Sequence, residues 1–308
     1  MPLDPQAKAY LDQLAAVGAP SLAELPVEEA RRLFRERRSL AGPPEEVGKV
    51  EDRTIAGGIP VRVYTPIGDI EGPRPALMFF HGGGWTIGDL DTVDTPCRRL
   101  ANGSGCVVVS VDYRRAPEHR FPAALDDAFA ATGYVAAHPE EFGVDPDRLA
   151  VGGESAGGNL AAAVALRARD RGGPPIAFQM LIYPVLDSGC NTPSYREHAE
   201  GYGLTRLGMR RYWSNYLPDL VSGRDPLAAP ASADDLRGLP PALVQTAEFD
   251  VLRDEAESYA ARLRAAGVAA ECRRYDGLIH GYFYFAGIID RGRGAIDDAA
   301  RALEMKLR

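Results

Sequence analysis

Short, almost continuously apolar runs alternate with helix-like stretches over most of this chain, and that alternation limits the folds open to it. Strands buried on both faces have this apolar character. The runs occupy residues 60–65, 76–81, 106–113, 148–153, 177–184 and 241–248, with a further strand expected at 268–275. The helix-like stretches between them occupy residues 92–102, 123–138, 156–170 and 254–266. Together they predict an α/β fold around a mostly parallel central sheet flanked by helices.

Two parts of the chain depart from this alternation. Residues 6–17 and 27–38 carry apolar positions at helical spacing, and the second stretch is acidic early and basic late, which suits a helix dipole. Residues 186–222 are aromatic, glycine-rich and irregular, with one helix expected near 206–216. So long an interruption is either a lid over a site or an ordinary surface excursion.

Composition excludes some classes of partner. The net charge of −8 over 308 residues disfavours a nucleic-acid or anionic-membrane partner, although a local basic patch stays open. No apolar stretch is long enough for membrane insertion, and the N-terminus lacks a signal-peptide pattern. The cysteines show no zinc-ligand spacing, so we expect reduced thiols and a cytoplasmic location, with disulfides left open: Cys97, Cys106, Cys190 and Cys272. Monomer and homodimer are both compatible with the sequence.

The first candidate for chemistry is Ser155. It lies in Gly153-Glu154-Ser155-Ala156-Gly157, between an apolar run and a helix-like stretch. Strand, G-x-S-x-G and helix in this order form the context of a nucleophile elbow. The alternatives are a close-packed glycine turn or a phosphate-binding loop, but the stretch lacks the Lys-Ser/Thr ending of a P-loop.

A second glycine-rich stretch, Phe79–Trp85 with the sequence FFHGGGW, follows another apolar run. Three consecutive glycines let backbone N–H groups approach a ligand oxygen without hindrance from a Cβ atom. The alternative is a flexible surface turn, but the flanking Phe79, Phe80 and Trp85 favour a buried loop. HGGG followed by G-x-S-x-G predicts a serine nucleophile with backbone donors for an oxyanion.

A serine hydroxyl needs a general base. We favour His280, because the chain order serine, acid, histidine is typical of α/β-hydrolases. The other histidines have simpler interpretations as loop, helix-end or insertion residues: His81, His119, His138 and His198.

The orienting acid should follow a late strand. Asp250 is favoured because it lies just beyond the run 241–248, with Glu248 and Asp254 as less favoured candidates. Asp254 and Glu255 are also placed to interact with the dipole of the next helix.

These motifs together resemble the bacterial esterases of the hormone-sensitive-lipase group within the α/β-hydrolase superfamily. The matching stretches cover nearly the whole chain, in order: HGGGW at 81–85, DYRRAPEHRFPAALDDA at 112–128, GESAGG at 153–158, EFDVLRDE at 248–255 and HGYF at 280–283. The resemblance implies an α/β-hydrolase fold with a helical cap. It also implies a carboxylic-ester hydrolase with Ser155, Asp250 and His280 as its catalytic triad.

The resemblance further implies how the site is enclosed. Backbone N–H groups of Gly83, Gly84 and Ala156 would form the oxyanion hole. Residues 1–45 and an insertion at about 186–222 would form the cap over a catalytic domain of residues 46–308. Five residues are candidates for an apolar substrate pocket, with packing inside the cap as the alternative: Trp85, Leu204, Tyr212, Trp213 and Tyr282. No metal or other cofactor is expected.

The implied reaction is hydrolysis of short- to medium-chain acyl esters, small molecules, through an acyl-enzyme. An amidase, a lactonase or an acetyl esterase would share this machinery. A non-catalytic receptor on the same fold is a further alternative, because gibberellin receptors are similar in sequence, but they lack the histidine that is present here as His280. Two departures, Glu154 where aspartate is commoner and Arg115 where an apolar residue is commoner, leave specificity open rather than reaction class.

Overall fold

The strands form a single sheet with the order β1-β2-β4-β3-β5-β6-β7-β8 in the parts of the chain that this computed structural model describes, residues 1–68, 71–219 and 221–308. β2 runs antiparallel to β1 and β4, and all other neighbouring strands are parallel. The predicted mostly parallel sheet is therefore confirmed. Its strands are β1 (Lys49–Ile55), β2 (Ile59–Thr65), β3 (Arg74–Phe80), β4 (Val107–Val111), β5 (Val144–Glu154), β6 (Phe178–Ile182), β7 (Ala242–Phe249) and β8 (Ala270–Ile279).

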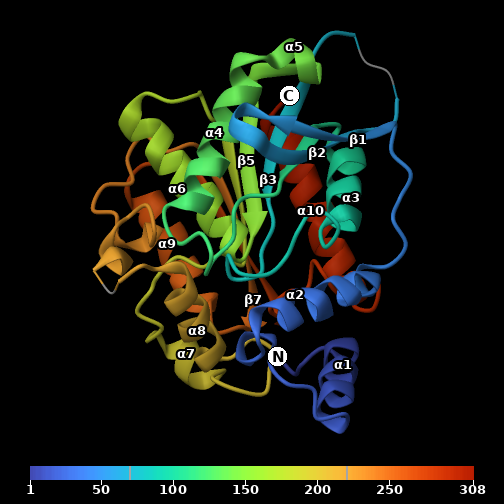
Figure 1. Cartoon of the computed structure of the whole chain (residues 1–308), viewed down its shortest axis with the longest axis vertical. Coiled ribbons are helices and arrows are strands. Elements are labelled where there is room, and N and C mark those ends of the chain that lie inside the picture. The colour runs from blue at the N-terminus through green and yellow to red at the C-terminus, as the bar shows by residue number, and fades with distance from the viewer. Residues whose placement is uncertain (69–70, 220) are drawn as a thin grey trace.

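Helices cover both faces of the sheet, and Figure 1 shows α4, α6 and α9 on one side and α3 and α10 on the other. Their bounds are α1 (Pro5–Ala16), α2 (Val27–Glu36), α3 (Asp94–Ser104), α4 (Ala123–Ala137), α5 (Pro139–Phe142), α6 (Ala156–Arg171), α7 (Pro193–Glu197), α8 (Arg206–Tyr216), α9 (Arg253–Ala265) and α10 (Asp290–Lys306). Met78 and Phe80 of β3 belong to the core under α4 and α6, whereas Leu77 and Phe79 belong to the core under α3 and α10. Because successive side chains of a strand point to opposite faces, a continuous apolar run fills both cores.

The N-terminal segment and the 186–222 insertion lie together at one end of the sheet. Figure 1 shows α1, α2, α7 and α8 gathered at the bottom of the view, beside β7. α8 packs against the short 3₁₀ helix Leu22–Glu24, which follows α1. The two segments whose sequences depart from the alternation of strands and helices are therefore neighbours in space.

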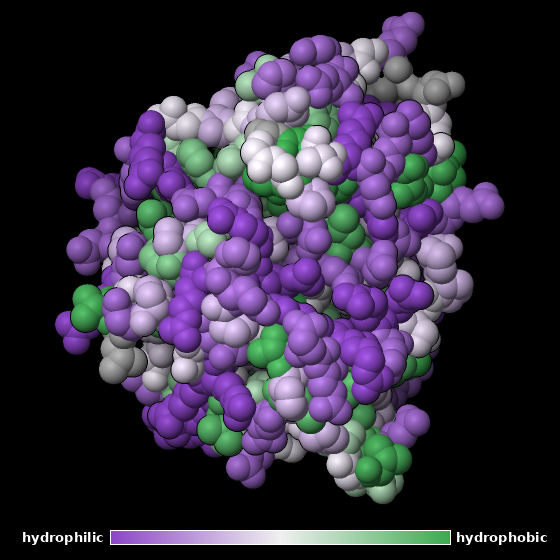
Figure 2. Space-filling model, viewed as in Figure 1, coloured by the Kyte–Doolittle hydropathy of each residue, from purple (hydrophilic) through white to green (hydrophobic). Residues whose placement is uncertain are grey.

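The surface is mainly hydrophilic. Figure 2 shows small, separate apolar patches, one of them at the tip of the molecule where α1 lies in Figure 1. Across the described ranges, no helix combines the length and the apolar character needed to cross a membrane.

Candidate active site

The stretch around Ser155 forms a sharp bend between β5 and α6. Ser155 has φ 58° and ψ −117°, a conformation that few residues other than glycine adopt. The bend brings α6 against the end of β3: a Cβ atom on Gly157 would lie 1.8 Å from the carbonyl oxygen of Phe80, and one on Gly153 would lie 2.3 Å from it. The flanking glycines are therefore required by close packing around a strained serine, which is the geometry of a nucleophile elbow.

A chain of hydrogen bonds joins Ser155 to two residues far away in sequence. Ser155 Oγ lies 3.1 Å from Nε2 of His280, and Nδ1 of His280 lies 2.8 Å from Oδ2 of Asp250. Asp250 directly follows β7 and His280 directly follows β8, so neighbouring parallel strands present both side chains at the same edge of the sheet. The Leu252 backbone N–H donates to Oδ1 of Asp250 at 3.0 Å and fixes the carboxylate. This arrangement can remove a proton from a serine hydroxyl.

The other acidic candidates are engaged elsewhere. Glu248 accepts from the backbone N–H of Gly277 at 2.6 Å and pairs with the N-terminal ammonium group. Asp254 accepts from the Ser194 N–H, and Glu255 accepts from the Leu186 N–H, so both hold the 186–222 insertion against α9. Within the described residues, Asp250 is the only one of these carboxylates that hydrogen-bonds to His280.

The remaining histidines lie outside the hydrogen-bond chain. His198 Nε2 accepts from Arg253 at 3.1 Å, His138 Nδ1 lies 3.0 Å from the carbonyl oxygen of Tyr134, and His119 is exposed. His81 is buried at the start of the glycine loop, and its Nδ1 lies 2.8 Å from the carbonyl oxygen of Gly82.

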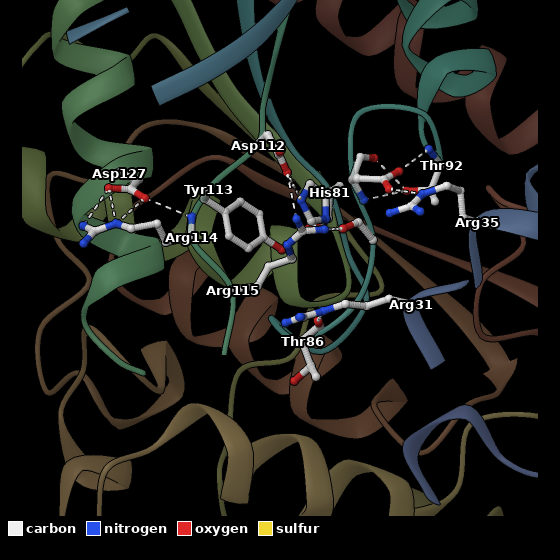
Figure 3. Close-up of polar contacts among 12 residues, drawn as sticks. Arg31, Arg35, His81, Thr86, Thr92, Asp112, Tyr113, Arg114, Arg115 and Asp127 are labelled. Carbon is white, nitrogen blue, oxygen red and sulfur yellow. Dashed lines mark hydrogen bonds and ion pairs between the residues drawn. The ribbon is translucent and has the colours of Figure 1, made fainter. Parts of the chain in front are cut away.

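The segment after β4 holds the glycine loop at its beginning and just beyond its end. The Tyr113 hydroxyl donates to the His81 carbonyl at 2.7 Å, and the two rings stack with centroids 4.3 Å apart. Figure 3 shows this pair together with Asp112 and Arg115. Arg115, the unusual residue of its motif, donates to the carbonyl oxygen of Gly88 just beyond the loop. The loop is thereby fixed before any ligand arrives, as a site for a developing oxyanion requires.

The structure distinguishes among the three loop glycines. Gly82 donates its N–H to Glu154, so that donor is already used. Gly83 and Gly84 have φ of 102° and 57° and line the same cavity as Ser155. Ala156 is the first residue of α6, where backbone N–H groups have no acceptor within the helix. Of the three predicted oxyanion-hole residues, Gly83 and Gly84 thus share a cavity with Ser155, and Ala156 directly follows it.

Burial changes the acidity of Glu154, the residue directly before Ser155. Its Oε1 accepts from the Gly82 N–H and from the Tyr284 hydroxyl, and its Oε2 has no partner among the described residues. Burial raises the pKa of Glu154 from 4.5 to about 8, against the lowering effect of these hydrogen bonds. The carboxyl group therefore carries a proton at neutral pH, and it ties the elbow, the glycine loop and the segment after His280 together.

Replacing Glu154 by glutamine should make stability less sensitive to pH. Between pH 4.5 and about 8 the native protein holds a proton that the unfolded chain has lost, so the free energy of unfolding falls as pH rises. Glutamine keeps an acceptor oxygen but cannot ionise. From pH 6 to pH 8 we expect wild type to lose about 2 kcal/mol more stability than Glu154→Gln, measured by urea unfolding. The exposed Glu140→Gln serves as the control, and equal losses in Glu154→Gln and wild type would contradict the assignment.

A cavity of about 380 Å³ opens above Ser155 and His280. The N-terminal segment supplies one wall through α1 and the turn after it, and the insertion supplies another through α8. Further lining comes from α2 and the turn after it, the glycine loop, the elbow and the residues after β8. Most lining side chains are apolar, and the cavity size falls in the lower part of the roughly 300–1,000 Å³ range of small-molecule sites.

Two of the five pocket candidates line this cavity, namely Leu204 and Tyr212. The Tyr212 ring occupies the space that a Cβ atom on Gly84 would fill, so it packs directly on the glycine loop. The other three lie in the core instead. Trp85 stacks on Tyr216 with centroids 4.1 Å apart and contacts Trp213, while the Tyr282 hydroxyl donates to Gln245.

The structure also adds residues that the sequence did not single out. Leu11 and Leu14 of α1, Phe34 of α2 and Tyr284 and Phe285 after β8 all line the cavity. The helical apolar spacing of residues 6–17 was the only signal for the α1 residues, and it did not show what they face.

A larger groove of about 750 Å³ lies between α3 and the antiparallel strands. Its charged groups neutralise one another: Arg62 pairs with Asp52 and Asp91, and Arg98 pairs with Asp94. Neither Ser155 nor His280 lines it, so its size alone does not make it the site of chemistry.

Comparison with known proteins agrees with the fold. A family model described as alpha/beta hydrolase fold matches residues 77–284, and the chain belongs to that family. It is 41% identical over 315 residues to the carboxylesterase NlhH of Mycobacterium tuberculosis, covering 99% of this chain and 96% of that protein. The carboxylic ester hydrolase LipN of the same species is 45% identical over 276 residues, covering 86% of this chain and 73% of LipN. The solved structure of ester-hydrolase EH1AB1 from the Lake Arreo metagenome matches with a TM-score of 0.95 and 42% identity, covering 98% of each chain. These findings confirm the predicted family and set the chain among carboxylesterases.

Proposed function

We propose that this chain is a serine carboxylesterase that hydrolyses short- to medium-chain acyl esters through an acyl-enzyme. The observation that carries this proposal is the hydrogen-bond chain from Asp250 through His280 to Ser155 at the floor of an apolar cavity. The esterase names of relatives that align over nearly the whole chain support it.

In the first half-reaction, Ser155 Oγ attacks the ester carbonyl carbon while His280 Nε2 takes the hydroxyl proton. The carbonyl oxygen becomes an oxyanion, which accepts hydrogen bonds from the N–H groups of Gly83, Gly84 and Ala156. The carbon–oxygen bond to the alcohol then breaks, and His280 gives its proton to the departing alkoxide. Asp250 keeps the imidazole oriented and stabilises its positive charge.

In the second half-reaction, a water molecule replaces the alcohol. His280 Nε2 takes a proton from the water as its oxygen attacks the acyl carbon. The tetrahedral intermediate collapses, the Ser155 ester bond breaks, and the proton returns to Ser155 Oγ. The products are one carboxylic acid and one alcohol.

The cavity of about 380 Å³ supports the proposed preference for shorter acyl chains. Residues 1–45 and 186–222 act in this proposal as a cap that limits the room above Ser155, over a catalytic domain of residues 46–308.

A cytoplasmic location and the absence of nucleic-acid partners are part of the same proposal. They are supported by the net charge of −8 and by four cysteines that are all free.

A series of p-nitrophenyl esters tests the function directly. We expect kcat/KM to be highest between acetate and octanoate and to fall by about tenfold or more for palmitate, because a cavity of about 380 Å³ lies in the lower part of the range for small-molecule sites. A maximum at palmitate would contradict the chain-length preference.

A fluorophosphonate probe should label the wild-type protein covalently, and a protein that neither turns over any ester nor takes the label would contradict the esterase function.

The receptor alternative predicts binding without turnover. It has no support from the geometry, because His280 is present and within hydrogen-bonding distance of Ser155. Parallel assays with p-nitroanilides and lactones separate the esterase from an amidase or a lactonase.

A further inference from the structure

α2 and the 3₁₀ turn after it, Arg37–Ala41, carry five arginines, and one of them differs from the rest. Four have a carboxylate partner: Arg31 with Glu118, Arg32 with Glu36, Arg35 with Asp89 and Arg38 with Asp91. Figure 3 shows how Arg31 and Arg35 reach across to the loops of the catalytic domain. Arg37 has no carboxylate within ion-pair distance among the described residues, although the chain carries 43 acidic residues.

Arg37 lies at the substrate cavity, not in the open solvent beside α2. It is half-buried and lines the same cavity as Ser155 and His280. Its positive charge acts on two other residues that line that cavity, Tyr10 of α1 and Tyr212 of α8. Burial raises the pKa of both Tyr10 and Tyr212, and the Arg37 charge opposes that rise in each. The guanidinium is therefore electrostatically coupled to the space that a substrate would enter.

No lining carboxylate neutralises this charge. Glu154 is the only acidic side chain that lines the cavity within the described residues. It is protonated at neutral pH and already bound to Tyr284 and Gly82. A ligand in the cavity thus meets one permanent cation in a largely apolar enclosure, where an ion pair is screened less than on an open surface.

We propose that Arg37 forms an anion-recognising subsite, and that the esters hydrolysed best carry a free carboxylate besides the scissile ester group, as half-esters of dicarboxylic acids do. A guanidinium can hold a carboxylate through two parallel hydrogen bonds, which fixes the orientation of the bound ester. The carboxylate takes no part in bond making or breaking. This inference rests on the proposed esterase function and adds a substrate class to it.

The test compares a neutral ester with matched anionic ones. Ethyl butyrate is the neutral substrate. Monoethyl succinate, glutarate and adipate place a carboxylate at increasing distance on the acyl side, and 4-butyryloxybutanoate places one on the alcohol side. For at least one anionic ester, we expect Arg37→Gln to lower its kcat/KM relative to that of ethyl butyrate by about tenfold, mainly through KM. Arg37→Lys should restore part of that ratio, because it keeps the charge without the fork of donors.

Arg38→Gln is the matched control, since Arg38 is the next residue but pairs with Asp91 outside the cavity. It should leave the ratio at the wild-type value, and added salt should lower the ratio in wild type but not in Arg37→Gln. A ratio that changes less than twofold in Arg37→Gln for every anionic ester overturns the inference. If that happens while wild type still hydrolyses ethyl butyrate, the esterase function stands; no hydrolysis of any ester overturns both.

Discussion

Replacing Ser155 by alanine is expected to lower kcat for p-nitrophenyl butyrate by about five orders of magnitude. The substitution removes the only oxygen that His280 Nε2 contacts in the hydrogen-bond chain. Residual hydrolysis would come from the backbone donors and the cavity alone. Stability should change little, because alanine meets the same backbone strain at φ 58° as serine does. Steady-state kinetics and urea unfolding of the same preparation measure both effects.

The exposed Ser39→Ala is the control for this prediction and should keep wild-type kinetics. The Ser155→Ala protein should also lose covalent labelling by a fluorophosphonate. Wild-type turnover in Ser155→Ala, or undiminished labelling, would exclude Ser155 as the nucleophile.

Replacing Asp250 by asparagine is expected to lower kcat by about 10⁴-fold while leaving the fold intact. The Leu252 N–H donates to Oδ1 of Asp250, so an asparagine amide would keep its oxygen on that side. Its NH₂ group would then face Nδ1 of His280, where Oδ2 now lies at 2.8 Å. Nδ1 would have to accept, the imidazole proton would move to Nε2, and Nε2 could no longer take the Ser155 proton.

Asp254→Asn provides the comparison, because Asp254 lies four residues farther along and contacts Ser194 instead of His280. We expect it to keep at least half of the wild-type kcat. Similar losses in Asp250→Asn and Asp254→Asn would show that the effect comes from the strand end as a whole and not from the contact with His280.

The sequence predicted the interior of the sheet better than its border. β3, β4 and β6 are buried on both faces, so hydrophobic burial alone makes their sequences continuous apolar runs. β1 was not predicted: it lies at the edge of the sheet, and its sequence KVEDRTI leaves most side chains partly or fully exposed. α10 was also missed, since its buried face consists largely of alanine and glycine, which give a weak apolar signal.

The candidate chemistry was predictable because it rests on local motifs. The elbow and the glycine loop each require small residues at fixed spacing, and Asp250 and His280 follow strands that the apolar pattern places at one sheet edge. Their roles stay predictions until the variants are measured.

The cavity lining was not predictable in the same way. Trp85 and Trp213 are aromatic residues near the motifs, but they pack on each other and on Tyr216, and a sequence does not show which neighbour an aromatic ring will find. Arg37 stands among four other arginines in the sequence. Arg37 differs from the other four in the positions of the surrounding carboxylates, which the sequence alone does not show.

The cavity combines walls from α1 and α8 with the candidate catalytic groups at the ends of β5, β7 and β8. A change in α1, for instance at Leu11 or Leu14, can alter which molecules fit without touching the groups that transfer protons. Residues of α1 can thus affect which esters are bound, whereas the candidate catalytic groups are encoded farther along the gene. Substitutions in the first few dozen codons can therefore change the shape of the cavity while the sheet that positions Ser155, Asp250 and His280 stays the same.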